Sequence, residues 1–354
     1  MNFIKTMPYT LPLKTRYRWA KGDHDSRSGI LIQVSLDGAG GWGEVAYGPH
    51  VTRDWRLLAN ELADKFAGLN LGSDDLLEQV DRLNLHNRER NGIASAWLSA
   101  RAMQAGQPLA HYLAGPGETP ADEVPINGLI NKDAPGDVIA QGQAYADQGM
   151  TTFKIKCFAD VARDLERVRA LRDAFPDFRF RLDPNDAWKS IDAALRNMEA
   201  FATFGIDYVE DPLDTHSATF EDMATLHRSG PAIPLAWDNP VESRSHMERL
   251  LELDAVDVFI FKMPRSGGPD RQLDMIRCAA AAGKLAVMTG PIESAIGTMG
   301  GHHLAALLPR PIPDCGFSLS QHFARDSADL SPIVNGRRKL PETPGLGLTP
   351  DMAV

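Results

Sequence analysis

Ionisable residues recur at a regular interval along the second half of the chain, and this spacing constrains the fold more than any other feature. Lys156, Asp183, Glu210, Asp238 and Lys262 follow one another every 24 to 28 residues. Each stands at the carboxyl end of a short apolar run, and amphipathic helical patterns separate the runs. Such alternation is typical of βα units around a parallel sheet. The spacing therefore predicts one ionisable group per βα unit.

The way these strand ends are grouped distinguishes two α/β folds. In a (β/α) barrel they converge on one mouth, whereas an open doubly wound sheet spreads them along a crevice. Roughly seven or eight units fit between residues 124 and 320. We therefore predict an α/β fold, a (β/α)7β TIM-like barrel with an α+β N-terminal capping domain. The expected divisions are residues 1–120 for the cap, 121–320 for the barrel and 321–354 for a C-terminal segment that packs back on the cap.

The first 120 residues lack the βα alternation. "GILIQVSL" and "GWGEVAYG" flank a glycine-rich turn and predict a hairpin. "TRDWRLLANELADKFAGL" and "GIASAWLSARAMQAGQPLAHYLAG" have helical spacing, and the second is expected to end at Gly115-Pro116. "GAGGWG" matches the G-x-G-x-x-G of dinucleotide sites, but it joins two strands and opens no helix, so we interpret it as a turn.

Charge and cysteine content argue against several classes of protein. The 37 basic and 47 acidic residues give a net charge of -10, which disfavours binding to nucleic acid or to anionic lipid. Three scattered cysteines provide neither a disulfide framework nor a metal knuckle. The sequence shows no signal-peptide pattern and no apolar run of membrane-spanning length. We expect a cytoplasmic globular protein, monomeric or homo-oligomeric, without a membrane partner.

Three of the strand-end residues are carboxylates on consecutive strands. Asp183, Glu210 and Asp238 would repel one another at one mouth unless a cation neutralised them. An all-oxygen ligand set suits a hard divalent ion, so the sequence predicts a Mg²⁺ site in which Mn²⁺ could substitute.

Two lysines share one face of the strand "TTFKIKC". Lys154 and Lys156 alternate with Phe153, Ile155 and Cys157, which are expected to pack outward against helices. A lysine that is partly desolvated beside a metal and another cation can lose its proton and act as a base. Removal of a proton next to a carboxylate leaves an enediolate, which a metal can stabilise. The pattern therefore indicates proton abstraction alpha to the carboxylate of a small substrate.

Six blocks occur in the order of an enolase superfamily active site: "KIK", "RLDPNDAW", "YVEDP", "LAWDN", "FIFKMPRSGG" and "GPIESAIG". With the lysine pair on the second strand and a lone lysine on the sixth, the chain resembles the muconate-lactonizing subgroup. "GWGEVAYGPHVTRDW" and "IESAIG" are most similar to the o-succinylbenzoate synthase family, the dehydratases of menaquinone biosynthesis. The resemblance covers residues of about 29 to 307.

The resemblance implies a role for each matching residue. Asp183, Glu210 and Asp238 would bind Mg²⁺; Lys156 would remove the α-proton and then help the hydroxyl depart; Lys262 would stabilise the enediolate, and Lys154 would hold the substrate carboxylate and depress the pKa of Lys156. The implied substrate-binding residues are Asn185, Arg181, Arg27, Gly290, Pro291 and Glu293. The loop at residues 20–29 resembles the lid that the cap folds over the mouth.

Two departures from the family pattern fall where specificity is set. Asn239 stands where an acidic residue is expected, and Gly290-Pro291 replaces serines before "IES". Related enzymes with the same lysine pair racemise N-acylamino acids, epimerise dipeptides or cycloisomerise muconates, and some dehydratases of this type also racemise N-succinylamino acids. The Asp-x-Asp of dipeptide epimerases is absent from "GPIES". Racemase and epimerase activities stay open beside dehydration, as does an inactive binding protein on the same fold.

Two further features have structural interpretations. His302-His303 lies on an apolar helix without a third ligand nearby in sequence, which favours buried or capping histidines over a zinc site. The tryptophans are expected in the core, with Trp188 beside the metal-ligand block.

Overall fold

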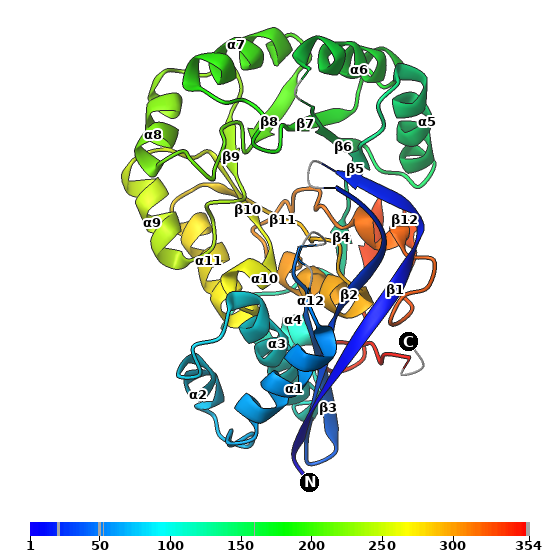
Figure 1. The fold of residues 1–354 in the computed structure, drawn as a ribbon, viewed down its shortest axis with the longest axis vertical. Helices are drawn as coiled ribbons and strands as arrows, with labels where there is room; N and C mark the ends of the chain where they lie inside the picture. The colour runs from blue at the N-terminus through cyan, green and yellow to red at the C-terminus, as the bar shows by residue number, and fades with distance from the viewer. Residues whose placement is uncertain (20–21, 49–50, 52, 159, 352–354) are drawn as a thin grey trace.

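A curled parallel sheet of seven strands is the main element of the computed structural model, which describes residues 1–19, 22–48, 51, 53–158 and 160–351 (Figure 1). The strands pair in the order β11-β10-β9-β8-β7-β6-β5, so each lies beside the next in the chain. Their bounds are β5 (Gly128–Ile130), β6 (Thr152–Lys156), β7 (Arg179–Asp183), β8 (Ile206–Glu210), β9 (Leu235–Trp237), β10 (Val258–Phe261) and β11 (Leu285–Met288). The predicted parallel α/β sheet is confirmed.

A short segment bridges the two edges of this sheet. The backbone nitrogen of Gly316 donates to the carbonyl oxygen of Met288 in β11 at 2.9 Å. The backbone nitrogen of Cys315 donates to the carbonyl oxygen of Pro125, just before β5, at 2.8 Å. The edge groups that an open sheet would leave unpaired are thereby satisfied at these positions.

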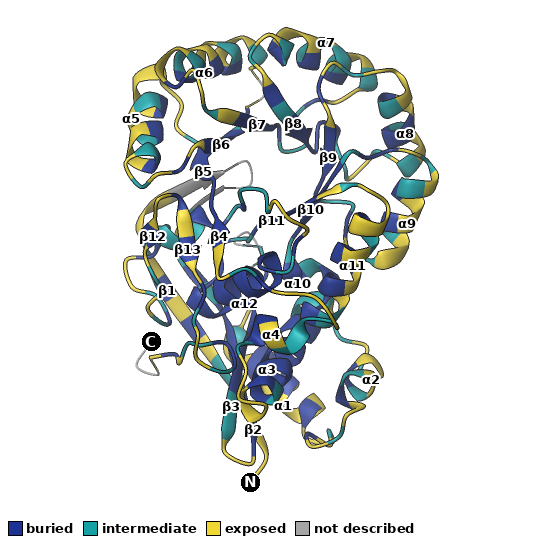
Figure 2. Cartoon of the chain, turned by 180° about the vertical axis from the view of Figure 1, so that it is seen from behind, coloured by how far each residue is buried: buried dark blue, intermediate teal, exposed yellow. Residues whose placement is uncertain are grey.

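Helices surround the outside of the sheet and turn their exposed residues away from it (Figure 2). They are α5 (Pro135–Ala146), α6 (Val161–Ala174), α7 (Ile191–Ala202), α8 (Phe220–Arg228), α9 (Arg244–Glu252), the short α10 (Met263–Ser266), α11 (Pro269–Ala281) and α12 (Ala295–Ala305). Phe153 and Ile155 of β6 are fully buried between sheet and helices, as predicted. Phe153 lies against Phe175 in an edge-to-face contact, with 5.3 Å between the ring centroids. The opposite face of the sheet carries the buried apolar cluster Tyr208, Ala236, Val258, Ile260 and Val287.

A second hydrophobic cluster consists mainly of N-terminal residues, joined by Ile292, Ile296, Met299, Phe323 and Leu346. Here β1 (Phe3–Trp19), β2 (Gly22–Leu36) and β3 (Ala39–Val45) form an antiparallel sheet, accompanied by α1 (Trp55–Phe66), α2 (Leu76–Asp81), α3 (Asn87–Gln104) and α4 (Leu109–Leu113). We call this part the N-terminal unit. It requires glycine where α3 crosses β3, because a Cβ at Gly41 would lie 2.1 Å from the Ala96 carbonyl oxygen.

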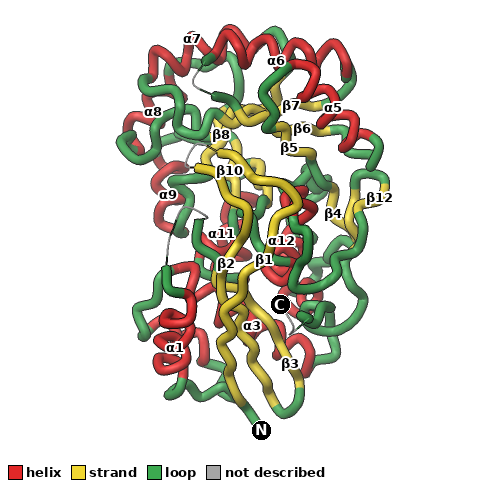
Figure 3. The backbone as a smooth tube through the Cα atoms, turned by 45° about the vertical axis from the view of Figure 1, so that its right-hand side comes forward, coloured by secondary structure: helices red, strands yellow, loops and turns green. Residues whose placement is uncertain are grey.

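The N-terminal hairpin is longer than the sequence suggested. Residues 22–29, which were expected in a loop, belong to β2, and residues 20–21 lie outside the described part. Pairing of β1 with β2 continues from Ser35 down to Gly22, with a register shift between Pro12 and Tyr17. The two strands reach from the N-terminal unit to the curled sheet (Figure 3). The expected loop was wrong because backbone pairing, rather than side-chain pattern, extends these strands.

The single helix expected over residues 92–115 is also wrong, because two helices occupy this stretch. α3 ends at Gln104, and Gly106 then adopts a left-handed φ of 66°. Pro108 precedes α4 and cannot supply the backbone N–H that a continuous helix needs at that point.

The C-terminal residues contact both parts. After the 3₁₀ helix η1 (Ser318–His322), β12 (Ile333–Val334) and β13 (Arg337–Lys339) form a small antiparallel sheet with β4 (Glu123–Pro125). Farther on, the backbone nitrogen of Leu109 in α4 donates to the Gly345 carbonyl oxygen at 2.7 Å. Among the helices of the described residues, none combines the length and apolar character that crossing a membrane would require.

Candidate functional site

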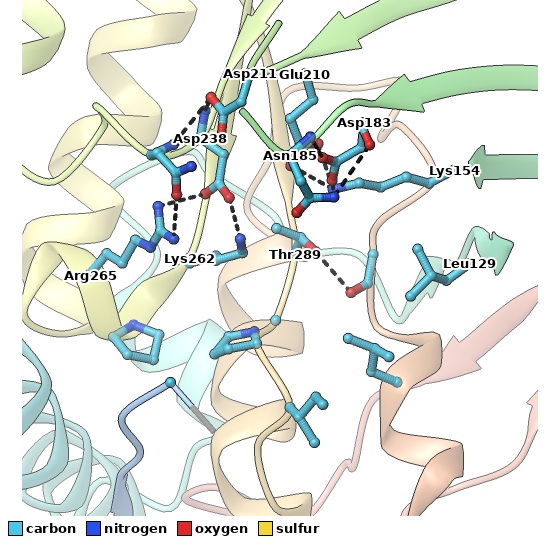
Figure 4. Close-up of a pocket in the computed structure, with 18 of the residues that line it drawn as sticks. Leu129, Lys154, Asp183, Asn185, Glu210, Asp211, Asp238, Lys262, Arg265 and Thr289 are labelled. Atoms are coloured by element: carbon cyan, nitrogen blue, oxygen red, sulfur yellow. Dashed lines mark hydrogen bonds and ion pairs between the residues drawn. The ribbon is translucent and has the colours of Figure 1, made fainter. Parts of the chain in front are cut away.

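A cavity of about 480 Å³ lies where the parallel strands end (Figure 4). All nine of the following predicted site residues line it: Lys154, Lys156, Asp183, Asn185, Glu210, Asp238, Lys262, Gly290 and Pro291. Ala46, Gly48 and Arg88 of the N-terminal unit contribute to the same wall. The tertiary structure therefore brings together the strand-end residues that the spacing predicted.

On one side of the cavity, the two lysines of β6 contact the carboxylates of β7 and β8. The Lys154 Nζ lies 2.5 and 2.6 Å from the two Glu210 carboxylate oxygens, and 2.8 Å from Asp183 Oδ2. The Lys156 Nζ lies 2.5 Å from Asp183 Oδ2 and 2.9 Å from Asn185 Oδ1. Each buried negative charge is thus matched by an ammonium group, which offsets the cost of its burial.

On the other side, Lys262 and Arg265 contact Asp238, the residue that follows β9 (Figure 4). Lys262 Nζ donates to Asp238 Oδ2, and Arg265 Nη1 lies 3.3 Å from Asp238 Oδ1. Lys262 follows β10, so Lys156 and Lys262 approach the buried carboxylates from different strands. The two amines therefore reach the same cavity from different strands.

Burial and neighbouring charges shift the pKa values of these groups in different directions. Burial alone would lower the pKa of Lys154, but Asp183 and Glu210 outweigh it and raise that pKa well above its usual value. Burial lowers the pKa of Lys262, and Arg265 adds to the effect against the opposing influence of Asp238. Lys262 is therefore easier to deprotonate than Lys154.

The acidic residues fit a hard divalent cation. Glu210, Asp211 and Asp238 are buried, and each offers an oxygen within 4.8 Å of the others. Asp183 is not in this group; Lys154 Nζ lies between Asp183 and Glu210, at 2.8 and 2.5 Å from their oxygens. Carboxylate oxygens are the ligands that Mg²⁺ prefers, and a divalent cation would offset the repulsion among the three acidic side chains. Asp211, which directly follows Glu210, thus belongs to this acidic group although it was not predicted.

Asp211 differs from its neighbours in its partners. Its carboxylate accepts hydrogen bonds from the backbone nitrogens of Asp238, at 2.9 Å, and of Asn239, at 3.1 Å. Burial, reinforced by Asp238, raises its pKa well above the usual value. These contacts hold the residue after β9 in place, so Asp211 also positions Asp238.

Asn239, one of the two departures from the family pattern, bridges groups of opposite charge. Its Nδ2 donates to both Asp186 carboxylate oxygens at 3.3 Å, and its Oδ1 accepts from Arg265 Nη2 at 2.7 Å. An amide can make both contacts, whereas a carboxylate would repel Asp186. Neither Asp186 nor Arg265 was predicted, because their importance arises from contacts made across the strand ends.

Three of the predicted substrate-binding residues, Arg27, Arg181 and Glu293, do not belong to the cavity lining. Arg27 is 2% exposed, and its guanidinium donates to the carbonyl oxygens of Tyr47 and Ile292, the latter at 2.6 Å. It thereby connects β2 to the segment after β11. Its role as a substrate contact stays a prediction.

Arg181 lies deeper, two residues before Asp183 on the same face of β7. Its Nη1 donates to the Asp314 carbonyl oxygen at 2.5 Å, and its guanidinium lies over the Tyr208 ring at 5.1 Å. Glu293 lies behind the cavity wall, because a Cβ at Gly290 would lie 3.6 Å from Glu293 Oε2. Both residues therefore support the wall from behind.

The two neighbouring histidines have the structural roles that the sequence favoured. His303 is fully buried, accepts a hydrogen bond from the Ala110 backbone nitrogen at 3.2 Å, and contacts the Leu346 carbonyl oxygen at 3.1 Å. His302 contacts the Thr298 carbonyl oxygen at 2.7 Å. Burial lowers their pKa values to about 3 for His302 and about 4 for His303, so both are neutral at pH 7.

Comparison with known proteins agrees with this geometry. Residues 137–354 match the family model described as enolase C-terminal domain-like. The chain belongs to this family. The resemblance to the enolase superfamily that the motifs indicated is thereby confirmed.

Several relatives of this enolase family member align along most of its length. It is 26% identical over 91% of its residues to o-succinylbenzoate synthase from Thermobifida fusca, covering 82% of that protein. It is 23% identical to N-succinyl-L-Arg/Lys racemase from Bacillus cereus, over 96% of this chain and 92% of the racemase. The crystal structure of muconate lactonizing enzyme from Pseudomonas fluorescens superposes with a TM-score of 0.87 at 24% identity, covering 99% of this chain and 96% of that one.

Proposed function

We propose that this protein is a Mg²⁺-dependent enzyme that removes the proton alpha to a carboxylate and then eliminates water, as an o-succinylbenzoate synthase of menaquinone biosynthesis. One observation carries the proposal: Lys156 and Lys262 enter the same cavity from different strands, on either side of buried carboxylates that suit Mg²⁺. A small-molecule carboxylate is the substrate that such a site could hold.

The proposal includes an architecture. We infer that the curled sheet, with residues 315–316 bridging its edges, is a (β/α)7β barrel formed by residues 121–320. Residues 1–120 then form its cap, with the distal part of the β1-β2 hairpin as the lid, and residues 321–354 pack back on the cap. A cap that covers the mouth would exclude water from the reacting groups.

The side chains of this enzyme would divide the work. Asp183, Glu210 and Asp238, with Asp211 beside them, would hold Mg²⁺, which when bound supplies positive charge that stabilises the developing enediolate. Lys154 would orient the substrate carboxylate.

The two remaining lysines would handle the proton and the developing charge. Lys156 would remove the α-proton and return a proton to the departing hydroxyl on the same face. Lys262 would stabilise the enediolate from the opposite side.

Racemisation of N-succinylamino acids is the second candidate function. It is supported by the same two amines, because a base on each face of a planar intermediate could deliver a proton from either side. Dehydration needs only one proton-transferring face. The similarity to N-succinyl-L-Arg/Lys racemase covers more of the chain than that to o-succinylbenzoate synthase, at a slightly lower identity.

The assay that tests the proposal uses the cyclohexadiene precursor of o-succinylbenzoate. We expect rapid loss of the diene absorbance with Mg²⁺ and none with excess EDTA. No turnover, together with α-proton exchange of N-succinylamino acids in D₂O, would replace dehydration by racemisation. Absence of both reactions, without stabilisation of the fold by Mg²⁺, would favour an inactive binding protein.

A further inference from the structure

One cation in the cavity wall comes from the N-terminal unit. Arg88 is the second residue of α3 and is half-buried. The preceding Asn87 fixes this end of the helix, because its Nδ2 donates to the Arg265 carbonyl oxygen at 2.6 Å. The start of α3 is thus held against α10, beside the strand-end carboxylates.

Arg88 differs from the other basic side chains of the cavity in its lack of an acidic partner. Lysines and arginines of the lining that contact a carboxylate are Lys154, Lys156, Lys262 and Arg265. Among the residues that the structure describes, none forms a hydrogen bond or ion pair with the Arg88 guanidinium. Its recorded contact is with the Tyr47 ring, whose centroid lies 5.7 Å from Cζ.

Another arginine of the same helix, Arg90, has the acidic partners that Arg88 lacks. Arg90 donates to Asp81 at 2.5 Å, to Asp270 at 2.9 Å and to the Gly267 carbonyl oxygen at 2.7 Å. Arg90 therefore joins α3 to Asp81, Gly267 and Asp270, and these contacts occupy its guanidinium. Arg88 has the same donors but presents them to the cavity.

The surroundings of Arg88 favour an incoming anion. Burial lowers its pKa, and the positive charge of Arg265 lowers it further, against the opposing influence of Glu242 in the same cavity wall. A guanidinium nevertheless keeps its proton in proteins, and charges removed from water are normally paired. An anionic group of a ligand would supply the missing partner.

We propose that Arg88 is a specificity residue that binds a second anionic group of the substrate, a carboxylate remote from the one beside the reacting carbon. This inference rests on the proposed function of the site. The substrate would extend from the Lys154–Lys156 side of the cavity toward α3. A planar guanidinium can bind such a carboxylate through two parallel hydrogen bonds.

The test compares two probes that differ in one distal charge. N-succinyl-L-phenylalanine has a free distal carboxylate, and N-succinamoyl-L-phenylalanine has an uncharged amide there. Exchange of the α-proton in D₂O, followed by NMR with Mg²⁺ present, gives kcat and KM. Calorimetry on the same samples gives the two dissociation constants, whether or not exchange occurs.

We expect the Arg88→Gln variant to lose about 10- to 100-fold in kcat/KM and in affinity for the succinyl probe, mainly through KM. The succinamoyl probe should be unaffected, and Arg88→Lys should retain part of the preference. Arg53→Gln is the matched control. Arg53 lies over the same Tyr47 ring at 4.4 Å, pairs with Glu89 and does not line the cavity.

The outcomes separate this inference from the proposed function. Absence of exchange with both probes, together with absence of diene turnover, would argue against proton abstraction, while the calorimetric preference would still decide the role of Arg88. Equal losses for both probes, no loss for either, or no preference in the unaltered protein would overturn the role of Arg88. The same loss in Arg53→Gln would instead indicate a structural effect of the Tyr47 contacts.

Discussion

Two clusters of buried carboxylates in this molecule are stabilised by different kinds of partner. The strand-end cluster, Asp183, Glu210 and Asp238, is matched by lysine and arginine side chains. The junction cluster, which we define as Glu44 of β3 and Glu293 after β11, lies where the N-terminal unit meets the curled sheet.

In the junction cluster, the partners of Glu44 are neutral donors. Its carboxylate accepts from the Ser294 backbone nitrogen at 3.1 Å, from Ser294 Oγ at 2.5 Å and from the Gly297 backbone nitrogen at 3.0 Å. Tyr9 donates its hydroxyl proton to the same group. Burial, followed by the nearby charge of Glu44, raises the pKa of Glu293 well above its usual value.

The difference separates a site for chemistry from a site for assembly. Ammonium groups on flexible side chains can leave one carboxylate when a metal binds it and can then pair with a substrate instead. Backbone N–H groups at the start of α12 are fixed, and they hold a carboxylate from another part of the chain in one position. Changes in the first cluster should therefore alter activity, and changes in the second should alter stability.

The largest effect is expected from Lys156→Ala in the strand-end cluster. Loss of the amine removes the proposed base, so α-proton exchange should fall by about 100- to 10,000-fold while the fold persists. NMR exchange rates and circular dichroism would measure both. Lys189→Ala is the control, because Lys189 is exposed and pairs with Asp214 outside the cavity lining. Retained exchange in Lys156→Ala would remove the distinction between the clusters.

The next largest effect is expected from Glu44→Ala in the junction cluster. This change leaves the donors of Ser294 and Gly297 buried without an acceptor. Unfolding in urea should show a loss of about 3–5 kcal/mol in the free energy of unfolding. Exchange activity, measured well below the new midpoint, should change far less than in Lys156→Ala. A loss below about 0.5 kcal/mol would contradict the assembly role of this cluster.

A pH dependence should come from Asp326, which accepts a hydrogen bond from the Ala295 backbone nitrogen beside the junction at 2.7 Å. Burial raises its pKa from 3.8 to about 6, so the folded state holds more protons than the unfolded state between these values. Its contribution to stability is present at low pH and is lost as pH rises through about 6. His302 and His303 act in the opposite direction, since unfolding lets them take up protons below pH 6.5.

The difference between the unaltered protein and Asp326→Asn isolates the Asp326 contribution. From pH 7 to pH 5, the unaltered protein should gain stability relative to the variant, by at most about 1.4 kcal/mol per pH unit. Chemical unfolding at a series of pH values measures this difference. A constant difference across that range would show that Asp326 keeps an ordinary pKa.

The smallest effect is expected from Glu293→Gln. Burial and the charge of Glu44 raise the pKa of Glu293 and so favour its uncharged form, which an amide of similar size resembles. We expect a change within about 1 kcal/mol in the free energy of unfolding at pH 7, measured in urea. A loss as large as that of Glu44→Ala would mean that the two junction carboxylates act as one charged unit.

Much of the strand-end cluster could be predicted because its residues follow patterns within single strands and regular intervals along the sequence. Lys154 and Lys156 alternate with buried residues on one strand, and the intervals to Asp183 and Glu210 repeat the length of a βα unit. Parallel strands that pair in chain order necessarily bring those ends together. The parallel sheet, the cavity and the neutral histidines follow from such patterns.

The remaining features depend on contacts between residues far apart in sequence. The sequence by itself determined which strands end in ionisable groups and which face each lysine occupies, because strand periodicity sets both. Only the tertiary structure decided that Glu44 meets Ser294, that Asn239 bridges Asp186 and Arg265, and that Arg88 faces the cavity without an acidic partner. The contacts of Glu44 and Arg88 depend on how the N-terminal unit docks, and those of Asn239 depend on how neighbouring strand ends meet; the periodicity of a single strand or helix records neither.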